Sequence, residues 1–251
     1  MTIAILSALI EEQRGLIHSL AKARTIRRAG RDFWLGQIHG HDVVLALSRI
    51  GKVAAATTAT TLIEAFGATR IVFTGVAGGL GDGVAVGDVV LASHFLQHDM
   101  DASPLFPRYQ IPLYGRTLLA CDGKLNAILL KAINSMLTRE NGHFHHQNPA
   151  RPALAHQGLV ATADRFVSSA AEAATLKAGL RSAGFDALAV EMEGAAVAQV
   201  CFDHGLPFAA MRSISDRADD TAHVDFPEFV TRVASPYSQE IISGFLEMLP
   251  K

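Results

Sequence analysis

The sequence has few of the features that mark secreted, membrane or nucleic-acid-binding proteins. Only two of its 251 residues are cysteine, and only 18% are charged. Cys121 and Cys201 have neither metal-ligand spacing nor the density of a disulfide scaffold, so we expect a reducing, cytoplasmic location. The formal net charge is −2 and the basic residues are scattered along the chain, so we expect no nucleic-acid partner.

Long hydrophobic runs are also missing. The apolar start Ile3–Ile10 has no basic leader and ends at Glu11 and Glu12. It is well short of the roughly 20 residues that cross a bilayer. We therefore expect neither export nor a membrane anchor.

Apolar residues are plentiful, at 49% of the chain, which is enough for a core on both faces of a sheet. Short β-branched runs alternate with longer Ala/Leu-rich segments, a pattern typical of an α/β protein with a parallel or mixed sheet. We predict one domain over residues 1–251. The predicted strands are Ile3–Ala8, Phe33–His39, Asp42–Ser48, Arg70–Thr74, Asp88–His94, Gly158–Thr162, Ala187–Glu191 and Phe208–Ile214. The predicted helices are Glu11–Ala23, Val53–Phe66, Lys124–Arg139, Ala170–Ser182, Glu193–His204 and Phe226–Leu249.

Two stretches interrupt this alternation. Gln97–Gly115 contains three prolines among apolar residues, so we expect it to cover a site or a partner subunit. Residues 141–157 have no periodicity and many turn formers, which predicts a surface insertion. Its histidines have no carboxylate or cysteine nearby in the sequence, so we favour a solvated loop over a metal site.

Acidic or glycine-rich segments follow five of the predicted strands. Glu11 and Glu12 follow the first strand and could face a ligand crevice or simply begin a helix. Ser48–Val53 is a strand–glycine–helix junction, which is more often structural. Thr74–Gly83 requires a non-helical backbone close to a ligand or to another strand; it lacks the Lys-Ser/Thr of a phosphate-binding loop.

The most informative segments are Ala189–Ala198 and Met211–Asp220. In an extended chain Glu191 and Glu193 would point the same way and could face one crevice, although a buried ion pair or a helix cap would also account for them. Arg212, inside an apolar strand, needs a buried carboxylate, and we expect Glu193 or Glu12 to supply it. Asp216 could be a crevice acid or part of a surface turn.

Together these motifs resemble the purine-nucleoside phosphorylase/uridine phosphorylase superfamily, and within it the methylthioadenosine/adenosylhomocysteine nucleosidases. The resemblance covers nearly the whole chain and rests chiefly on two motifs, Val190–Ala196 with its Glu-Met-Glu and Ser215-Asp216. It implies a three-layer α/β/α sandwich around a central mixed sheet. It also implies cleavage of the adenine–ribose bond by water, with no cofactor and no metal.

The resemblance also implies a role for each matching residue. Asp216 would protonate adenine N7, with Ser215 orienting it; Glu12 would accept a proton from water, assisted by Arg212; and Glu193 would hold the ribose hydroxyls. The substrate-binding set comprises Ile50, Val76, Ala77, Gly78, Phe166, which stacks on adenine, Val167, whose backbone reads the base edge, Glu191, Met192, which packs against the sugar, and Ser215. Leu105, Phe106 and Phe226 would form the socket for the 5′-thio group. Part of that socket comes from a second subunit in this family, which implies a homodimer.

Three departures from the family pattern bear on the substrate. Val76 stands where a hydroxyl residue is usual, Arg49 replaces a small residue and could recruit an anion, and the loop Gln97–Gly115 differs. The alternatives are a phosphorylase, a nucleosidase for another purine nucleoside, and a binding protein without catalysis. The acids Glu11 and Glu12 would repel phosphate and so favour hydrolysis, whereas Arg14 and Arg49 favour phosphate.

Overall fold

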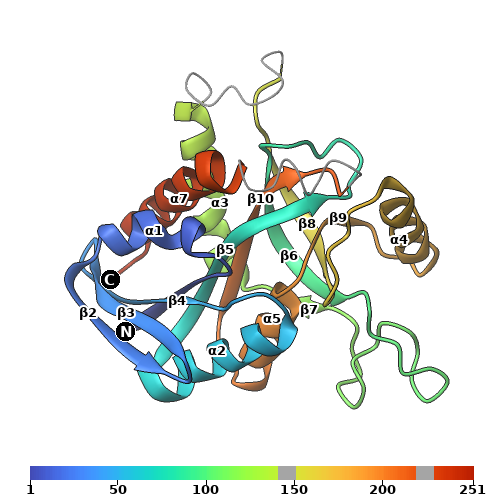
Figure 1. The fold of residues 1–251 in the computed structure, drawn as a ribbon, viewed down its shortest axis with the longest axis horizontal. Coiled ribbons are helices and arrows are strands. Elements are labelled where there is room, and N and C mark those ends of the chain that lie inside the picture. The colour runs from blue at the N-terminus through green and yellow to red at the C-terminus, as the bar shows by residue number, and fades with distance from the viewer. Residues whose placement is uncertain (141–150, 219–228) are drawn as a thin grey trace.

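The computed structural model describes residues 1–140, 151–218 and 229–251, and the predicted α/β class with a central mixed sheet is confirmed (Figure 1). Its strands are β1 (Thr2–Ser7), β2 (Ala21–Arg28), β3 (Arg31–Ile38), β4 (His41–Leu47), β5 (Ala68–Gly79), β6 (Val89–Gln97), β7 (Leu119–Ala120), β8 (Ala155–Thr162), β9 (Ala187–Glu191) and β10 (Phe208–Asp216). Its helices are α1 (Ile10–His18), α2 (Lys52–Phe66), α3 (Gly123–Glu140), α4 (Ala170–Ser182), α5 (Gly194–Asp203) and α7 (Ser235–Met248), the last preceded by the π-helical turn η1 (Val230–Ala234).

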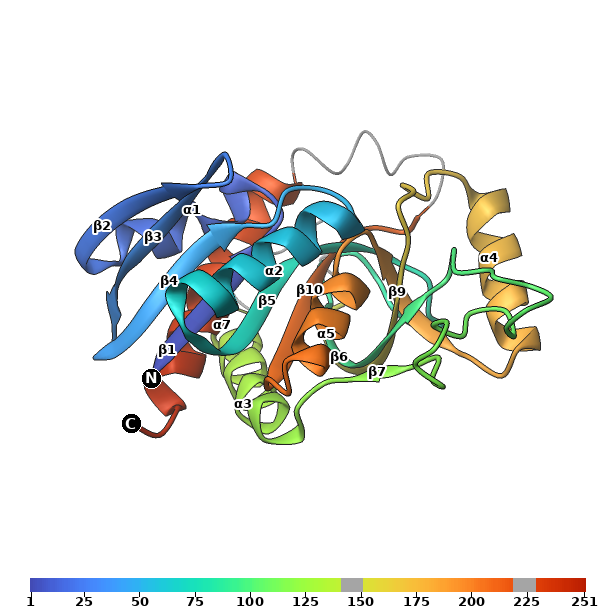
Figure 2. The same ribbon diagram turned by 90° about the horizontal axis from the view of Figure 1, so that it is seen from below.

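Helices cover both faces of the sheet (Figures 1 and 2). On one face α2 and α5 pack together, and their alanine-rich surfaces join a core that contains Phe73 and Phe95. On the other face α1, α3 and α7 enclose a second core around Leu45, Leu129 and Phe245. Helix α4 covers a smaller cluster at the far end of the sheet. Burial on both faces explains why the central strands are almost continuously apolar.

The sheet is open at one end and closed on itself at the other. From the edge inward its order is β2, β3, β4, β1 and β5, and β1 runs parallel to both β4 and β5. Beyond β5, strand β10 pairs with both β5 and β6, β6 pairs with β8, β8 with β9, and β9 returns to β5 at Gly78 and Gly79. The five strands β5, β10, β6, β8 and β9 therefore form a closed ring.

Most predicted elements are present, and the short strand β7 is an addition to them. The predicted helix Glu11–Ala23 ends at His18, and Ala21–Arg28 forms the edge strand β2, which we did not predict. Strand β5 continues through the glycine-rich segment to Gly79, so those glycines contact both a neighbouring strand and the cavity described below. The start of the predicted closing helix, residues 226–228, lies outside the described residues.

The carboxyl-terminal part of the predicted surface insertion belongs to the sheet. Residues 141–150 lie outside the described residues, but β8 already begins at Ala155. Arg151 and His156 bond to the fully buried carboxylate of Asp88, over 3.0 Å and 2.7 Å to Oδ2. His156 is therefore not the solvated loop histidine that we expected. We did not predict this contact because Asp88 and His156 are 68 positions apart in the sequence, so no local pattern links them.

No helix among the described ranges is long and apolar enough to cross a membrane.

Candidate active site

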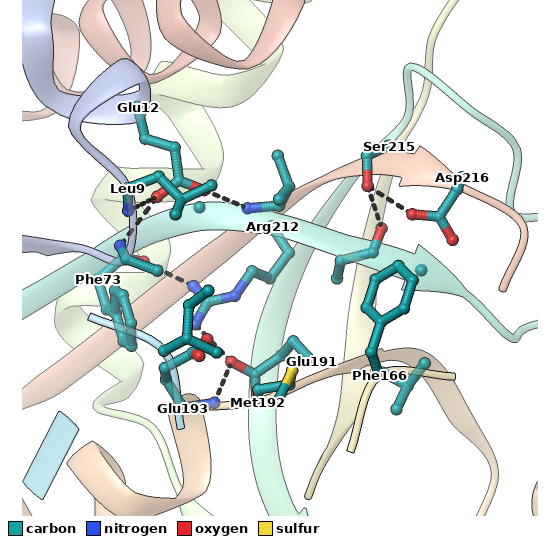
Figure 3. A pocket seen from close by; sticks show the side chains of 17 residues that line it. Leu9, Glu12, Phe73, Phe166, Glu191, Met192, Glu193, Arg212, Ser215 and Asp216 are labelled. Carbon is teal, nitrogen blue, oxygen red and sulfur yellow. Dashed lines mark hydrogen bonds and ion pairs between the residues drawn. The ribbon is translucent and has the colours of Figure 1, made fainter. Parts of the chain in front are cut away.

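A cavity of about 460 Å³ lies where β1, β4, β5, β9 and β10 end (Figure 3). Twelve of the sixteen residues predicted for the site line it: Glu12, Ile50, Val76, Ala77, Gly78, Phe166, Glu191, Met192, Glu193, Arg212, Ser215 and Asp216. Five lining residues were not predicted: Ala8, Leu9, Phe73, Gly75 and Val190. All five are adjacent in sequence to predicted site residues or to the ends of predicted strands. The predicted segments were therefore correct, although these individual residues were not named.

Glu12 lies in the first turn of α1 and is almost fully buried. Its Oε2 accepts hydrogen bonds from the backbone amides of Ala8 and Leu9, both over 2.9 Å, and its Oε1 accepts one from Val76 over 3.1 Å. Burial raises the pKa of Glu12 to about 6, although these amides and the charge of Arg212 oppose the rise. A carboxylate that is fixed in place and has a pKa close to neutrality suits a general base.

Arg212 pairs with Glu191, and the prediction that Glu193 or Glu12 would be its partner is wrong. The guanidinium donates to Glu191 Oε2 over 2.7 Å and stacks 4.1 Å from the ring of Phe73. Thr162 donates a short hydrogen bond to Glu191, and the amides of Glu193 and Gly194 complete its shell. Glu191 therefore provides the counter-charge of Arg212 within a buried, hydrogen-bonded pair.

Glu193 lies at the N-cap of α5, where the extended chain of β9 has ended. The amide of Gly51 donates to its Oε1 over 2.9 Å, from a backbone with φ of 96° that glycine adopts readily. Burial, followed by the charge of Glu191, raises the pKa of Glu193 above its usual range, and the Gly51 amide opposes the rise. The turn before α2 therefore fixes this carboxylate at the cavity wall.

Asp216 lies at the end of β10, across the cavity from Leu9 and Glu12 (Figure 3). Ser215 Oγ donates to its Oδ2 over 2.7 Å, and the Ala218 amide donates to its Oδ1 over 2.8 Å. A Cβ at Gly78 would lie only 3.0 Å from Asp216 Oδ1. The close approach of β5 to Asp216 therefore depends on glycine at this position.

The remaining predicted residues lie in different places. Phe166, with 44% exposure, stands at the cavity beside Asp216, and Val167 lines a recess of about 20 Å³ that adjoins the cavity. Leu105, which is 84% exposed, and Phe106 do not line the cavity of the single chain. Phe226 lies outside the described residues.

A polar network beside the cavity was not predicted, although two of its residues, Lys52 and Asp99, lie in the segments Ser48–Val53 and Gln97–Gly115 noted above. Lys52 Nζ bonds to Asp99 over 2.6 Å, and the Lys52 amide donates to Asp164 over 2.7 Å. Asp99 also accepts from the Asp164 amide over 3.0 Å. The network ties the turn that holds Glu193 to the segment that carries Phe166. Because its three residues are far apart in the chain, only the tertiary structure brings them together.

This architecture matches a known family. The family model for the phosphorylase superfamily matches residues 2–247. The chain belongs to the phosphorylase superfamily. The resemblance noted in the sequence is thereby confirmed.

Members of this superfamily resemble the chain over its full length. The 5′-methylthioadenosine/S-adenosylhomocysteine nucleosidase of Shewanella pealeana is 34% identical over 251 residues, which cover 99% of this chain and 100% of that relative. Among solved structures, the corresponding nucleosidase from Neisseria meningitidis, in complex with methylthio-immucillin-A, has a TM-score of 0.87 and 31% identity, with 99% of both chains covered. The native futalosine hydrolase of Helicobacter pylori has a TM-score of 0.85 and 31% identity, with coverage of 99% of this chain and 98% of that one.

Proposed function

We propose that the protein hydrolyses the N-glycosidic bond of 5′-methylthioadenosine and S-adenosylhomocysteine, releasing adenine and a thioribose. The observation that carries this proposal is that three carboxylates from distant parts of the chain, those of Glu12, Glu193 and Asp216, line one cavity. The full-length similarity to nucleosidases with this activity supports it. A binding protein that had lost catalysis would have no need for all three acids in these positions.

The base leaves at the end of the cavity that holds Asp216 and Phe166. As the C1′–N9 bond breaks, its electron pair moves onto the purine, and the proton of Asp216 passes to N7, so that neutral adenine departs. The Ser215 hydroxyl orients the Asp216 carboxyl, and Phe166 stacks on the base. The backbone at Val167 reads the base edge from the adjoining recess.

Water attacks at the opposite end. Glu12 accepts the proton of the attacking water while the water oxygen bonds to C1′. Glu193 holds the ribose hydroxyls and Met192 packs against the sugar. The negative charge of Glu193, when it is ionised, also stabilises the cation that develops on the sugar.

Water is favoured over phosphate because the lining residues that the structure describes offer phosphate no unpaired cation. Arg212 is the one guanidinium among the described lining residues, and Glu191 already neutralises it over 2.7 Å. Glu12, whose pKa is about 6, is ionised at neutral pH on the sugar side, where its negative charge repels a phosphate dianion. A phosphorylase would need a basic cradle at that position.

Product analysis tests the reaction type. Purified protein is incubated with 5′-methylthioadenosine in phosphate-free buffer and in phosphate, and the sugar product is identified. We expect free methylthioribose at equal rates in both buffers. A sugar 1-phosphate formed only with phosphate would identify a phosphorylase instead. Parallel rates on adenosine, S-adenosylhomocysteine and futalosine rank the 5′ groups, and a preference for futalosine would reassign the substrate.

We also propose that the protein acts as a homodimer in the cytoplasm, in the salvage of methionine sulfur. Large apolar side chains are exposed on the single chain, including Ile50 at 60%, Val53 at 78% and Leu105 at 84%. A second copy would cover such side chains and bring Leu105 and Phe106 to the 5′ socket. Light scattering should give twice the chain mass, and a monomer at micromolar concentration would contradict the dimer.

The free thiols of Cys121 and Cys201 support the proposed cytoplasmic location, because the cytoplasm keeps thiols reduced. Cell fractionation tests this location.

A further inference from the structure

The Lys52 ammonium lies outside the cavity but contacts the ends of two strands beside it. Its side chain is only 16% exposed, so the charge is held in place rather than free in solvent. Lys52 Nζ donates to Asp99 Oδ1 over 2.6 Å and to Gln97 Oε1 over 3.2 Å, both at the end of β6. It also lies 3.9 Å from Oδ2 of Asp164, which follows β8. One cation therefore links the turn before α2 to β6 and to the segment after β8.

The backbone next to this ammonium fixes Glu193. The Gly51 amide donates to Glu193 Oε1 over 2.9 Å, and the following amide, that of Lys52, donates to Asp164 Oδ1 over 2.7 Å. A Cβ at Gly51 would lie only 3.1 Å from Asp164 Oδ1, so the two segments are in close contact. A shift of the turn at Lys52 would therefore move the amide that holds Glu193.

A second route from Lys52 reaches Glu193 through α5. Gln97, which is 6% exposed, accepts from the ammonium and donates through its Nε2 to Gln199 Oε1 over 2.9 Å. Gln199 belongs to α5, and Glu193 is the N-cap of that helix. Because an N-cap residue moves with its helix, Lys52 holds Glu193 by both routes.

On the base side the same ammonium fixes the segment that leads to Phe166. Asp99 accepts from Lys52 through Oδ1 and from the Asp164 amide through Oδ2, the latter over 3.0 Å. Asp164 precedes Phe166 by two residues, and Phe166 stands at the cavity beside Asp216 (Figure 3). Both acids pair with Lys52. Without the ammonium, their two negative charges would repel each other and favour separation of the segments.

We propose that Lys52 is a positioning residue that holds the ribose side and the base side of the cavity in one arrangement. Its ammonium fixes Glu193 on the first side and Phe166 on the second. The inference rests on the nucleoside hydrolysis proposed above and identifies how the two halves of the nucleoside are aligned. Cleavage of the bond between them requires both halves to be held in register. Loss of the ammonium should therefore weaken the recognition of both.

Lys52→Met tests this, because it removes the ammonium and keeps the backbone amide and an unbranched side chain. Two nucleosides are compared: 5′-methylthioadenosine and its 2′,3′-dideoxy analogue, which lacks the hydroxyls assigned to Glu193. We expect kcat/KM to fall about tenfold on the first and less than about threefold on the second. The Kd of adenine, measured by calorimetry, should rise about fivefold because Phe166 is no longer held. Lys52→Arg should restore most of both losses.

Lys131→Met, the same change at an exposed position of α3, is the control and should alter none of these values by more than about twofold. If Lys52→Met fails to fold, Asp99→Asn should give the same pattern, since its single oxygen cannot serve both donors as the carboxylate does. These variants keep the comparison within the folded protein.

Equal changes on the two nucleosides, including no change, would overturn the proposal, because Lys52 would then not act through Glu193. An unchanged Kd of adenine would overturn it as well, since the base side would not depend on the ammonium. Failure of the wild type to hydrolyse 5′-methylthioadenosine would refute the nucleosidase alone. Calorimetric Kd values of the two nucleosides and of adenine, for wild type and Lys52→Met, would then decide the role of Lys52.

Discussion

Arg212 and Glu191 form a buried ion pair over 2.7 Å, with side chains that are 1% and 2% exposed. Removing one member leaves the other buried without a counter-charge, which typically costs about 3–5 kcal/mol. We expect Arg212→Met to lower the free energy of unfolding by about that amount, measured by urea titration at one protein concentration. The double variant Arg212→Met/Glu191→Leu should be more stable than Arg212→Met, since it removes both charges. If Arg212→Met unfolded like the wild type, the pair would not be needed for stability.

Asp216→Asn should leave the fold intact and lower kcat by roughly 10² to 10⁴, the range for loss of a positioned general acid. Asparagine retains an oxygen to accept the hydrogen bond from the Ala218 amide, so the melting temperature should stay close to that of the wild type. Adenine release is measured under saturating 5′-methylthioadenosine. Near-normal kcat would remove Asp216 from the role of proton donor.

The pH dependence of kcat/KM should report Glu12. A general base must be ionised to act, and burial raises the pKa of this carboxyl to about 6. On the acid side of the profile, the rate should therefore fall toward a tenfold loss per pH unit below that pH. A profile measured from pH 4.5 to 8.5 in the wild type checks this, and Glu12→Gln should be nearly inactive throughout. An acid limb centred near the usual pKa of glutamate would contradict the assignment.

Gly194→Ala should be strongly destabilising. A Cβ at this position would lie 2.1 Å from Cε1 of the fully buried Phe95 ring. Overpacking of this kind costs about 1–3 kcal/mol or more, because β6 and α5 must separate. The matched control is Gly179→Ala in α4, where the nearest atom is Tyr109 Oη at 3.6 Å and alanine should add about 0.5–1 kcal/mol of stability. The urea midpoints of the two variants should shift in opposite directions. If Gly194→Ala did not change the midpoint, the Phe95 ring would be able to move aside.

The sequence predicted the elements in which apolar residues alternate or recur at helical spacing. It missed elements that are stabilised mainly by hydrogen bonding to a neighbouring strand. Strand β2 reads Ala-Lys-Ala-Arg-Thr-Ile-Arg-Arg and is almost fully exposed, so it has no apolar face and is held by its pairing with β3. The prediction that Glu193 or Glu12 would be the partner of Arg212 was wrong for a different reason. Glu193 lies beyond the end of β9, and Gly51, 142 residues away, holds it in place of the arginine.

The acids that line the cavity at strand ends were predictable because an acid after an apolar strand is conspicuous. Contacts between remote segments were not. Asp88 was predicted only as the first residue of the strand Asp88–His94, and nothing local linked it to Arg151 or His156. Likewise, the Lys52–Asp99–Asp164 network follows from how β6, α2 and the segment after β8 meet in space.

The ring formed by β5, β10, β6, β8 and β9 gives the two ends of the cavity unequal freedom. Asp216 ends a strand of this ring, β10, which pairs with β5 as far as Asp216 and with β6 as far as Ser213, so its backbone is held close to its place. Leu9, Ile50 and Arg49 are carried by turns at the open half of the sheet. Changes of sequence in those turns can therefore reshape that end of the cavity while the position of Asp216 is preserved.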